Sequence, residues 1–198
     1  MNAAPQIDPE TGVVLLTEQQ WEESLDRYRA GEDTQPELAP ALSAAARPTA
    51  RIALARGGRR CLGWTGGAGA FLMVPRDRPL LELIPLQLAF LPDAIARLVE
   101  LGPRPRPARE TLRPPPADLA LAVARGAPLP GLPSVERHWE LRLTGEGDEP
   151  LGSIEVLDTA DGLWVVQPQG AEVTIRPSEA TAVWRRLTAL VRSVAARR

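Results

Sequence analysis

The sequence has no lysine, one cysteine and one histidine, and these absences exclude several kinds of site before any motif is considered. Since every basic side chain is arginine, a Schiff-base lysine and the lysine of a phosphate-binding P-loop cannot occur. Cys61 alone cannot form an internal disulfide, and together with His138 it leaves too few soft ligands for a standard zinc site. Any catalysis would therefore have to use carboxylates, hydroxyls and arginine.

Long apolar runs and an excess of positive charge are also missing. The formal net charge of −2 gives no net positive field of the kind that attracts nucleic acid without sequence preference. No apolar run approaches the roughly 18 residues of a membrane-spanning helix, and the polar segment 1–12 contains no arginine and does not match a secretory signal. With 44% hydrophobic and 24% charged residues, the composition is that of a globular chain, which we expect to be cytoplasmic.

The first half of the chain predicts a strand, two helices, a meander of strands and a third helix. Thr17 and Gln20 have the spacing of a capping box, and Leu16 and Trp21 are placed to form a hydrophobic staple, so a helix should begin after a short strand over 13–16. The remaining elements expected in this half are a weak helix over 37–46, strands near 51–54, 61–64, 70–74 and 80–84, and a helix over 86–101 capped by Gly102.

Segment 102–116 is too rich in proline for regular structure and is interpreted as an extended, semi-rigid connector. After it, the same order of elements returns. The elements expected there are a helix over 118–125, strands over 139–143, 152–157, 163–167 and 173–175, and a helix over 178–195 capped by Ser178.

The two halves also align residue by residue over short stretches. Phe71 aligns with Trp164 inside segments that both begin with glycine and end with proline, and Pro85 then aligns with Pro177. Apolar positions of the helices that follow also match, namely Leu91, Ile95, Leu98 and Val99 with Val183, Leu187, Leu190 and Val191. We interpret this match as an internal duplication of a unit made of a helix, four strands and a helix.

The duplication predicts the fold class and the domain organisation. Each half has one apolar sheet face and one amphipathic helix, and a pseudo-twofold arrangement hides both. We therefore expect an α+β fold with a central antiparallel sheet flanked by helices. It would be a single domain over 1–198, with similar halves at about 13–101 and 117–196 joined by the connector 102–116.

Individual reactive residues favour structural roles. His138 could act as a base beside Glu136 or Glu140, but a histidine at the start of a strand is more often structural. Cys61 lies within an expected strand and resembles a small buried hydrophobic residue more than a nucleophile. The glycine-rich segment 63–69 departs from the dinucleotide-binding pattern and is expected to form a hairpin turn.

Charge differs between the equivalent hairpins of the two halves. Segment 144–150 is acidic, whereas 56–60 is basic, and a purely structural repeat does not require this difference. It favours a surface adapted to one partner, and two solvated loops are the alternative. Asp158 and Asp161 are expected to shape a turn rather than bind a cation.

The last helix is expected to bury an apolar stripe that includes Trp184, and its arginines complement the helix dipole and could meet an acidic partner. The residues expected to contact a partner, in the acidic loop and on this helix, are Gly145, Glu146, Gly147, Asp148, Glu149, Arg185 and Arg192.

Three segments together resemble the EspG family, the secretion-associated chaperones of actinobacterial type VII (ESX) systems. They are the opening 15–21 with its Thr-Glu-Gln-Gln-Trp, the strand-and-helix block 51–101, and 173–177 leading into a helix rich in Ala, Arg and Leu. The resemblance implies a pseudo-twofold α+β fold and a cytosolic, non-enzymatic protein without a cofactor. Such a protein keeps secreted helical substrates of the PE/PPE or WXG kind in solution until export.

Two other functional classes are compatible with the residues. One is a small-molecule-binding or catalytic α+β domain, whose pocket would be lined by Trp64, Trp139 or Trp164 with an arginine gripping a carboxylate. The other is a dimerisation module that uses an unpaired sheet edge, which would make a weak homodimer. An enclosed pocket above ~300 Å³ with converging ionisable groups would favour a ligand site, and a shallow apolar groove beside the acidic loop would favour a chaperone.

Overall fold

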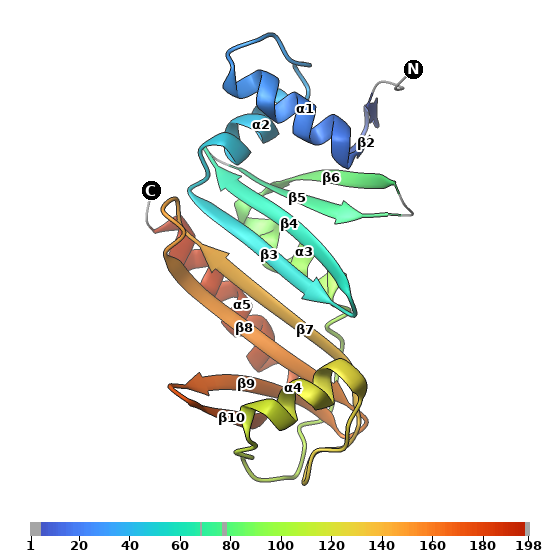
Figure 1. Cartoon of the computed structure of the whole chain (residues 1–198), viewed down its shortest axis with the longest axis vertical. Coiled ribbons are helices and arrows are strands. Elements are labelled where there is room, and N and C mark those ends of the chain that lie inside the picture. The colour runs from blue at the N-terminus through green and yellow to red at the C-terminus, as the bar shows by residue number, and fades with distance from the viewer. Residues whose placement is uncertain (1–4, 68, 77–78, 197–198) are drawn as a thin grey trace.

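A computed structural model describes residues 5–67, 69–76 and 79–196, which form a ten-stranded antiparallel sheet with helices on both faces (Figure 1). The strands are β1 (Gln6–Ile7), β2 (Val14–Thr17), β3 (Ala50–Arg56), β4 (Arg59–Gly66), β5 (Gly69–Pro75), β6 (Leu80–Gln87), β7 (Val135–Thr144), β8 (Pro150–Thr159), β9 (Gly162–Gln169) and β10 (Glu172–Ser178). The helices are α1 (Glu18–Arg29), α2 (Ala39–Ala46), the 3-10 helix η1 (Leu88–Phe90), α3 (Leu91–Leu98), α4 (Pro116–Arg125) and α5 (Ala180–Ala195). The α+β class and the antiparallel sheet are as expected from the sequence.

The order of strands in the sheet is β1-β2-β6-β5-β4-β3-β7-β8-β9-β10. Strands β3 and β7 pair at its centre, and from this pair each half runs outward as a meander, β3 to β6 in one direction and β7 to β10 in the other (Figure 1). The same strand order therefore extends in both directions from the centre.

The register of the sheet follows the alignment made on the sequence. Phe71 pairs with Pro85 across β5 and β6, and Trp164 pairs with Pro177 across β9 and β10. These are the two residue pairs that the sequence aligned with each other. The aligned residues thus occupy corresponding positions in the two outer ladders.

The helices divide the core into three clusters, one on one face of the sheet and two on the other. Helices α3 and α5 cover one face over β3 and β7 and bury the central cluster, which includes Leu54, Leu141 and Leu187. On the other face, α1 and α2 cover the first half and α4 covers the second (Figure 1). Among the residues that the structure describes, no helix lies over the middle of that face (Figure 1).

Alternation along the strands assigns side chains to these clusters. In β5, Ala70 and Leu72 belong to the central cluster, whereas Phe71 and Met73 pack in the cluster under α1 and α2. In β9, Trp164 packs under α4. Successive residues of a strand point to opposite faces, so a sheet with helices on both faces needs apolar residues in continuous runs.

The start of α1 confirms the predicted cap. The Thr17 hydroxyl accepts a hydrogen bond from the Gln20 amide at 3.2 Å, and the Gln20 side chain accepts one from the Thr17 amide at 2.6 Å. Leu16 and Trp21 are both buried in the same cluster, and the Trp21 ring stacks on Trp64 with 5.1 Å between centroids. This end of the helix is fixed by its own sequence.

Several helix boundaries differ from those predicted; α3, for example, ends at Leu98 rather than at residue 101, so Gly102 is not its cap. Strand β6 continues to Gln87 because Leu86 pairs with Ala70, so helical structure begins at Leu88 rather than at residue 86. Ser178 does not cap α5, because it ends β10 opposite Leu163; the N-cap is Glu179, and its side chain makes no capping hydrogen bond.

The connector is held against the second half by several contacts. Leu112 forms an isolated antiparallel bridge with Ile175 of β10, with both hydrogen bonds at 2.9 Å. A Cβ on Gly162 would lie only 2.2 Å from the carbonyl oxygen of Pro105, so the connector passes directly over this glycine. The proline-rich segment therefore packs on β9 and β10.

Candidate functional site

The acidic loop between β7 and β8 is a compact turn closed by its own backbone. The Gly145 amide donates to the Glu149 carbonyl at 2.8 Å, and the Glu149 carboxylate accepts from the Gly147 amide at 3.0 Å. Because that carboxylate folds back over Gly145, any side chain at position 145 would collide with it. Residues Glu146 to Glu149 are exposed, whereas Gly145 is buried.

One arginine of the first half crosses to this loop. Arg51 of β3 makes an ion pair with Asp148, and its guanidinium also donates to the Glu146 carbonyl at 3.4 Å. Asp148 has a positive φ of 63°, which the turn requires. The loop is thereby attached to the central strand, and Asp148 is not a free negative charge.

Arg185 and Arg192 are both exposed on α5 and lie seven residues apart, which places them two turns apart along one side of the helix. The β7–β8 loop and the C-terminal end of α5 lie at the same end of the central sheet (Figure 1). The loop and the last turn of α5, which carries Arg192, therefore lie at the same end of the sheet, and Arg185 lies two turns earlier in the helix.

Trp184 is a surface residue that the sequence placed in the core. It is 41% exposed, and its indole N–H donates to the Asp93 carboxylate of α3 at 3.2 Å. The buried side of α5 consists of Val183, Leu187, Val191 and Val194. Trp184 therefore lies at the margin of that stripe and links α5 to α3.

The uncovered middle of the other sheet face carries charged pairs. His138 Nε2 lies 3.0 Å from a Glu155 oxygen, and Arg142 Nε lies 2.5 Å from Glu140. Glu140 and Glu155 are direct cross-strand partners, so two carboxylates lie side by side with a cationic or titratable side chain beside each. The carboxylate in contact with His138 is that of Glu155, across the strand, and not Glu136 or Glu140.

A chain of ion pairs links the two halves beside the β3–β4 hairpin. Asp158 of β8, a side chain only 6% exposed, accepts hydrogen bonds from Arg104 at 3.2 Å and from Arg137 Nε at 2.9 Å. Arg137 also reaches Glu100, and Glu100 in turn pairs with Arg56 of β3. The chain connects the segment after α3, the connector and the strands β3, β7 and β8.

Asp158 thus has a different role from the one expected, because it holds two arginines and does not shape the turn. Asp161 does shape the turn. Its carboxylate accepts from the Thr159 hydroxyl at 2.6 Å and from the Trp164 indole at 3.2 Å.

The ion pairs that Glu100 makes with Arg56 and Arg137 line a cavity of about 790 Å³, which we call the hairpin cavity. It lies between the β3–β4 hairpin, the residues after α3, helix α4 and the start of β7. Its polar lining includes Arg56, Arg59, Arg137 and Glu100, and its apolar lining includes Val74, Leu98, Val123 and Val135. The pKa of Glu100 is lowered, chiefly by its hydrogen bond and charge interaction with Arg56.

Cys61 also lines the hairpin cavity and is half-buried against the central cluster. Burial raises the pKa of its thiol, and the positive charges of Arg59 and Arg56 oppose that rise. A raised pKa favours the protonated thiol over the more nucleophilic thiolate.

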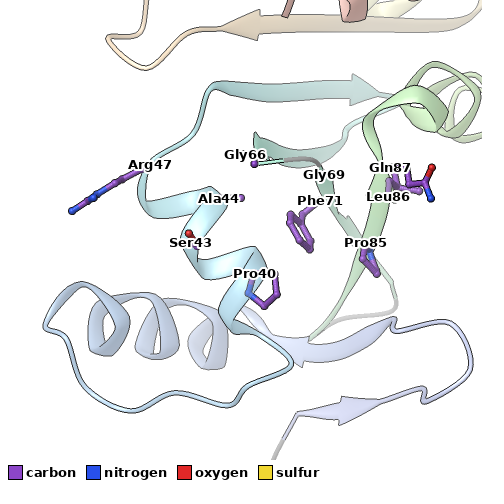
Figure 2. A pocket seen from close by; sticks show the side chains of 11 residues that line it. Pro40, Ser43, Ala44, Arg47, Gly66, Gly69, Phe71, Pro85, Leu86 and Gln87 are labelled. Carbon is purple, nitrogen blue, oxygen red and sulfur yellow. The ribbon is translucent and has the colours of Figure 1, made fainter. Parts of the chain in front are cut away.

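A second cavity, of about 660 Å³, opens between α2 and the adjacent ends of β4, β5 and β6. Figure 2 shows Phe71 and Pro85 on one side of it and Ala44 of α2 on the other, with Arg47 directed away. A Cβ on Gly66 would lie 3.0 Å from the Cα of Ala44, so this glycine allows the helix to approach the sheet.

The tryptophans expected to line a ligand pocket lie in the core or against other rings. Trp139 and Trp164 are buried in the central cluster and in the cluster under α4, and Trp64 stacks on Trp21. An arginine grip on a carboxylate is present, but it is built in the hairpin cavity from Arg56 and Arg137. Arg56, Glu100 and Arg137 lie far apart in the sequence, so no sequence motif could predict that they are in contact.

Among the residues that the structure describes, no group of three or more His, Cys, Asp and Glu side chains could hold a metal ion. Within the same residues, no helix is both long and apolar enough to cross a membrane.

No family model matches the sequence, and no curated protein matches it. The fold does match a solved structure, that of the Mycobacterium tuberculosis type VII secretion system chaperone EspG5 in complex with a PE25–PPE41 dimer. The TM-score is 0.54 at 12% sequence identity, over 96% of this chain and 88% of that chain. The similarity extends over nearly the whole of both chains and is a similarity of fold.

Proposed function

We propose that this protein is a non-enzymatic, cytosolic chaperone or adaptor that binds helical secretion substrates of the PE/PPE or WXG kind for a type VII secretion system. The observation that carries the proposal is the full-length fold similarity to EspG5, a chaperone bound in that structure to a PE25–PPE41 dimer. The sequence of segments 15–21, 51–101 and 173–177 also resembles the EspG family, which supports the same role.

Such a role requires a recognition surface and no reaction chemistry. A helical hairpin with an apolar tip aggregates when it is exposed, and a chaperone prevents this by covering the tip reversibly. In this fold the acidic β7–β8 loop and the exposed side of α5 lie on the surface at one end of the central sheet, where a client helix can reach them (Figure 1).

We also propose that the chain arose by duplication and is one domain with halves at about 13–101 and 117–196 around the connector 102–116. The mirrored strand order and the matched ladder positions of Phe71 and Trp164 support this history. Strand β2 and helix α1 of the first half correspond to the Leu112 bridge and helix α4 of the second half.

The client surface in this proposal comprises the acidic loop from Gly145 to Glu149 together with Arg185 and Arg192. Glu146, Arg185 and Arg192 are exposed charges of this surface, whereas Asp148 is paired with Arg51 and Glu149 folds over its own loop. In a weak homodimer, which we also propose, two copies would pair through a sheet edge. The outer edges are β1, with two residues, and β10, which pairs with Leu112 at one position.

Co-expression tests the proposal. The chain is expressed with each helical PE/PPE- or WXG-type protein encoded beside its gene, and the soluble fraction of that protein is measured. We expect the client to remain soluble only with the chaperone, and the variant Glu146→Gln/Arg192→Gln to lower the yield without changing the chaperone's own unfolding midpoint. Equal client solubility with and without the chain would contradict the proposal.

The hairpin cavity supports a second candidate, a small-molecule-binding domain. Its volume of about 790 Å³ lies within the range of ligand sites, and ionisable groups converge on one side of it. Neither this cavity nor the one beside α2 is lined by the acidic loop in the described part of the chain. The two functions are separable, because one uses the loop and α5 and the other uses the hairpin cavity.

A further inference from the structure

We infer that Arg56 and Arg137 form a carboxylate-binding site in the hairpin cavity, and that Glu100 occupies this site as an internal competitor which a ligand replaces. The ligand is a carboxylate joined to an apolar group. It can come from a free organic acid or from an acidic side chain on an apolar segment of a partner.

The two guanidinium groups meet on one carboxylate. Arg56 Nη2 lies 2.7 Å from Glu100 Oε1, and Arg137 Nη1 lies 2.7 Å from Glu100 Oε2. Each oxygen is thus bound by a different arginine, in the short, charge-assisted geometry that recognises carboxylates. Glu100 itself is 61% exposed, whereas the arginines are 29% and 26% exposed, so the receptor is more enclosed than its present occupant.

Each arginine keeps a second anchor that does not involve Glu100. Arg56 donates to the Leu98 carbonyl at 2.5 Å, and Arg137 is held by the buried carboxylate of Asp158. Departure of Glu100 would therefore leave both guanidinium groups in place. A preorganised pair binds a second carboxylate without the cost of ordering two long side chains.

The local charge balance favours an anion at this position. Arg56, Arg104 and Arg137 are balanced by Asp158 and Glu100, which leaves one excess positive charge. Without Glu100 the excess becomes two, around groups that are partly removed from water. Partly buried cations of this kind are stabilised by a paired anion.

The backbone at Glu100 is strained. Its φ is +54°, and it occupies the left-handed position that ends α3. The Glu100 amide donates to the Arg97 carbonyl, and the Leu101 amide donates to the Ala96 carbonyl at 2.8 Å. This is the Schellman arrangement, and its left-handed position favours glycine. A glycine there would preserve the turn and empty the arginine pair.

The apolar lining sets the rest of the ligand. Val74, Leu98, Val123 and Val135 line the cavity together with the arginines, so a carboxylate bound between Arg56 and Arg137 has apolar walls within the same space. Arg59 at the hairpin adds a further positive charge to the lining. A short aliphatic acid fits this combination of charge and wall.

The test compares Glu100→Gly with the wild-type chain by titration with hexanoate, followed through the arginine side-chain N–H signals in NMR spectra. We expect the variant to bind hexanoate at least about ten-fold more tightly, because the internal competitor is gone. Hexanamide should not bind. Adding Arg56→Gln to the variant should abolish the gain, and Glu136→Gln, which alters another carboxylate of the same cavity, should behave as wild type.

Equal affinities of wild type and Glu100→Gly, or a gain that survives Arg56→Gln, would overturn the inference. Glu100→Gln removes the competing carboxylate but keeps a side chain at position 100, in case the glycine alters the turn.

A capped helical peptide with one glutamate among leucine and alanine identifies the source of the ligand. Tighter binding than hexanoate indicates a partner's side chain, and weaker binding indicates a free acid. The outcome does not depend on client capture, so the proposed chaperone function can fail while this inference holds.

Discussion

Leu54 and Leu141 face each other across the central β3–β7 pair, and both are buried, with 2% and 0% of their surface exposed. The neighbouring pairs are Ala53 with Arg142 and Ala55 with Glu140, so Leu54 and Leu141 lie at the midpoint between the two meanders. Both side chains belong to the central cluster, which residues of both halves build. The stability of each half therefore depends on the other.

Truncating either leucine should destabilise the whole chain. We expect Leu54→Ala and Leu141→Ala each to lower the free energy of unfolding by about 2–5 kcal/mol, because each leaves a cavity in a closely packed core. Urea unfolding measures the effect and should show one transition, since the cluster spans both halves. Leu121→Ala, at a position 45% exposed on α4, is the control and should change the free energy by less than about 0.5 kcal/mol. Two separate transitions would contradict a shared core.

Asp158 should matter more to stability than any exposed ion pair. Asp158→Asn removes the charge that holds Arg104 and Arg137, and we expect a loss of about 3 kcal/mol in the free energy of unfolding, because a buried pair is broken from one side. The matched change Asp148→Asn breaks the exposed pair with Arg51 and should cost less than about 1 kcal/mol. Equal losses in the two variants would show that the chain of ion pairs is not structural.

Glu100 gives the stability a defined pH dependence. Because the pKa of its carboxyl is lowered from an ordinary value of 4.5, the unfolded chain takes up the proton first as the pH falls. The stabilisation by its ion pairs is therefore complete above pH 4.5 and is lost as the pH falls below that value toward the lowered pKa. Unfolding measured between pH 7 and pH 3 should show a difference between wild type and Glu100→Gln that shrinks at low pH. A difference that stays constant would refute the assignment.

Cys61 should react slowly with thiol reagents. Burial raises its pKa, so at pH 8 the folded protein should be alkylated by iodoacetamide more slowly than the same protein in urea. Arg59→Gln should slow the reaction further, since the charge of Arg59 lowers the thiol pKa. A folded-state rate as fast as that in urea would indicate an activated thiol.

The sequence predicted the fold correctly where a short local motif specifies a single helix or strand. The capping box at Thr17 and Gln20 located α1, and the segments framed by glycine and proline around Phe71 and Trp164 predicted equivalent strands. Ladder pairing overrode helix periodicity at Leu86, because a neighbouring strand was available to extend β6.

The hairpin cavity was not predictable, because its parts come from segments far apart in the chain. Glu100 and Arg137 are 37 residues apart, and neither belongs to a motif. Gly102 was the expected cap of the third helix, whereas the left-handed position is taken by Glu100. The sequence placed Trp184 in the core because helical periodicity shows which side of α5 faces the sheet. Periodicity does not show how far across that side the neighbouring elements extend, and Trp184 stays 41% exposed.

Copurification tests the chaperone role most directly. The tagged chain is expressed with helical type VII substrates encoded beside its gene, and the purified material is analysed by size-exclusion chromatography with light scattering. The account predicts a stable complex with at least one of them, with a mass equal to the sum of the chain and its client. Elution of the chain without any of these proteins would contradict it.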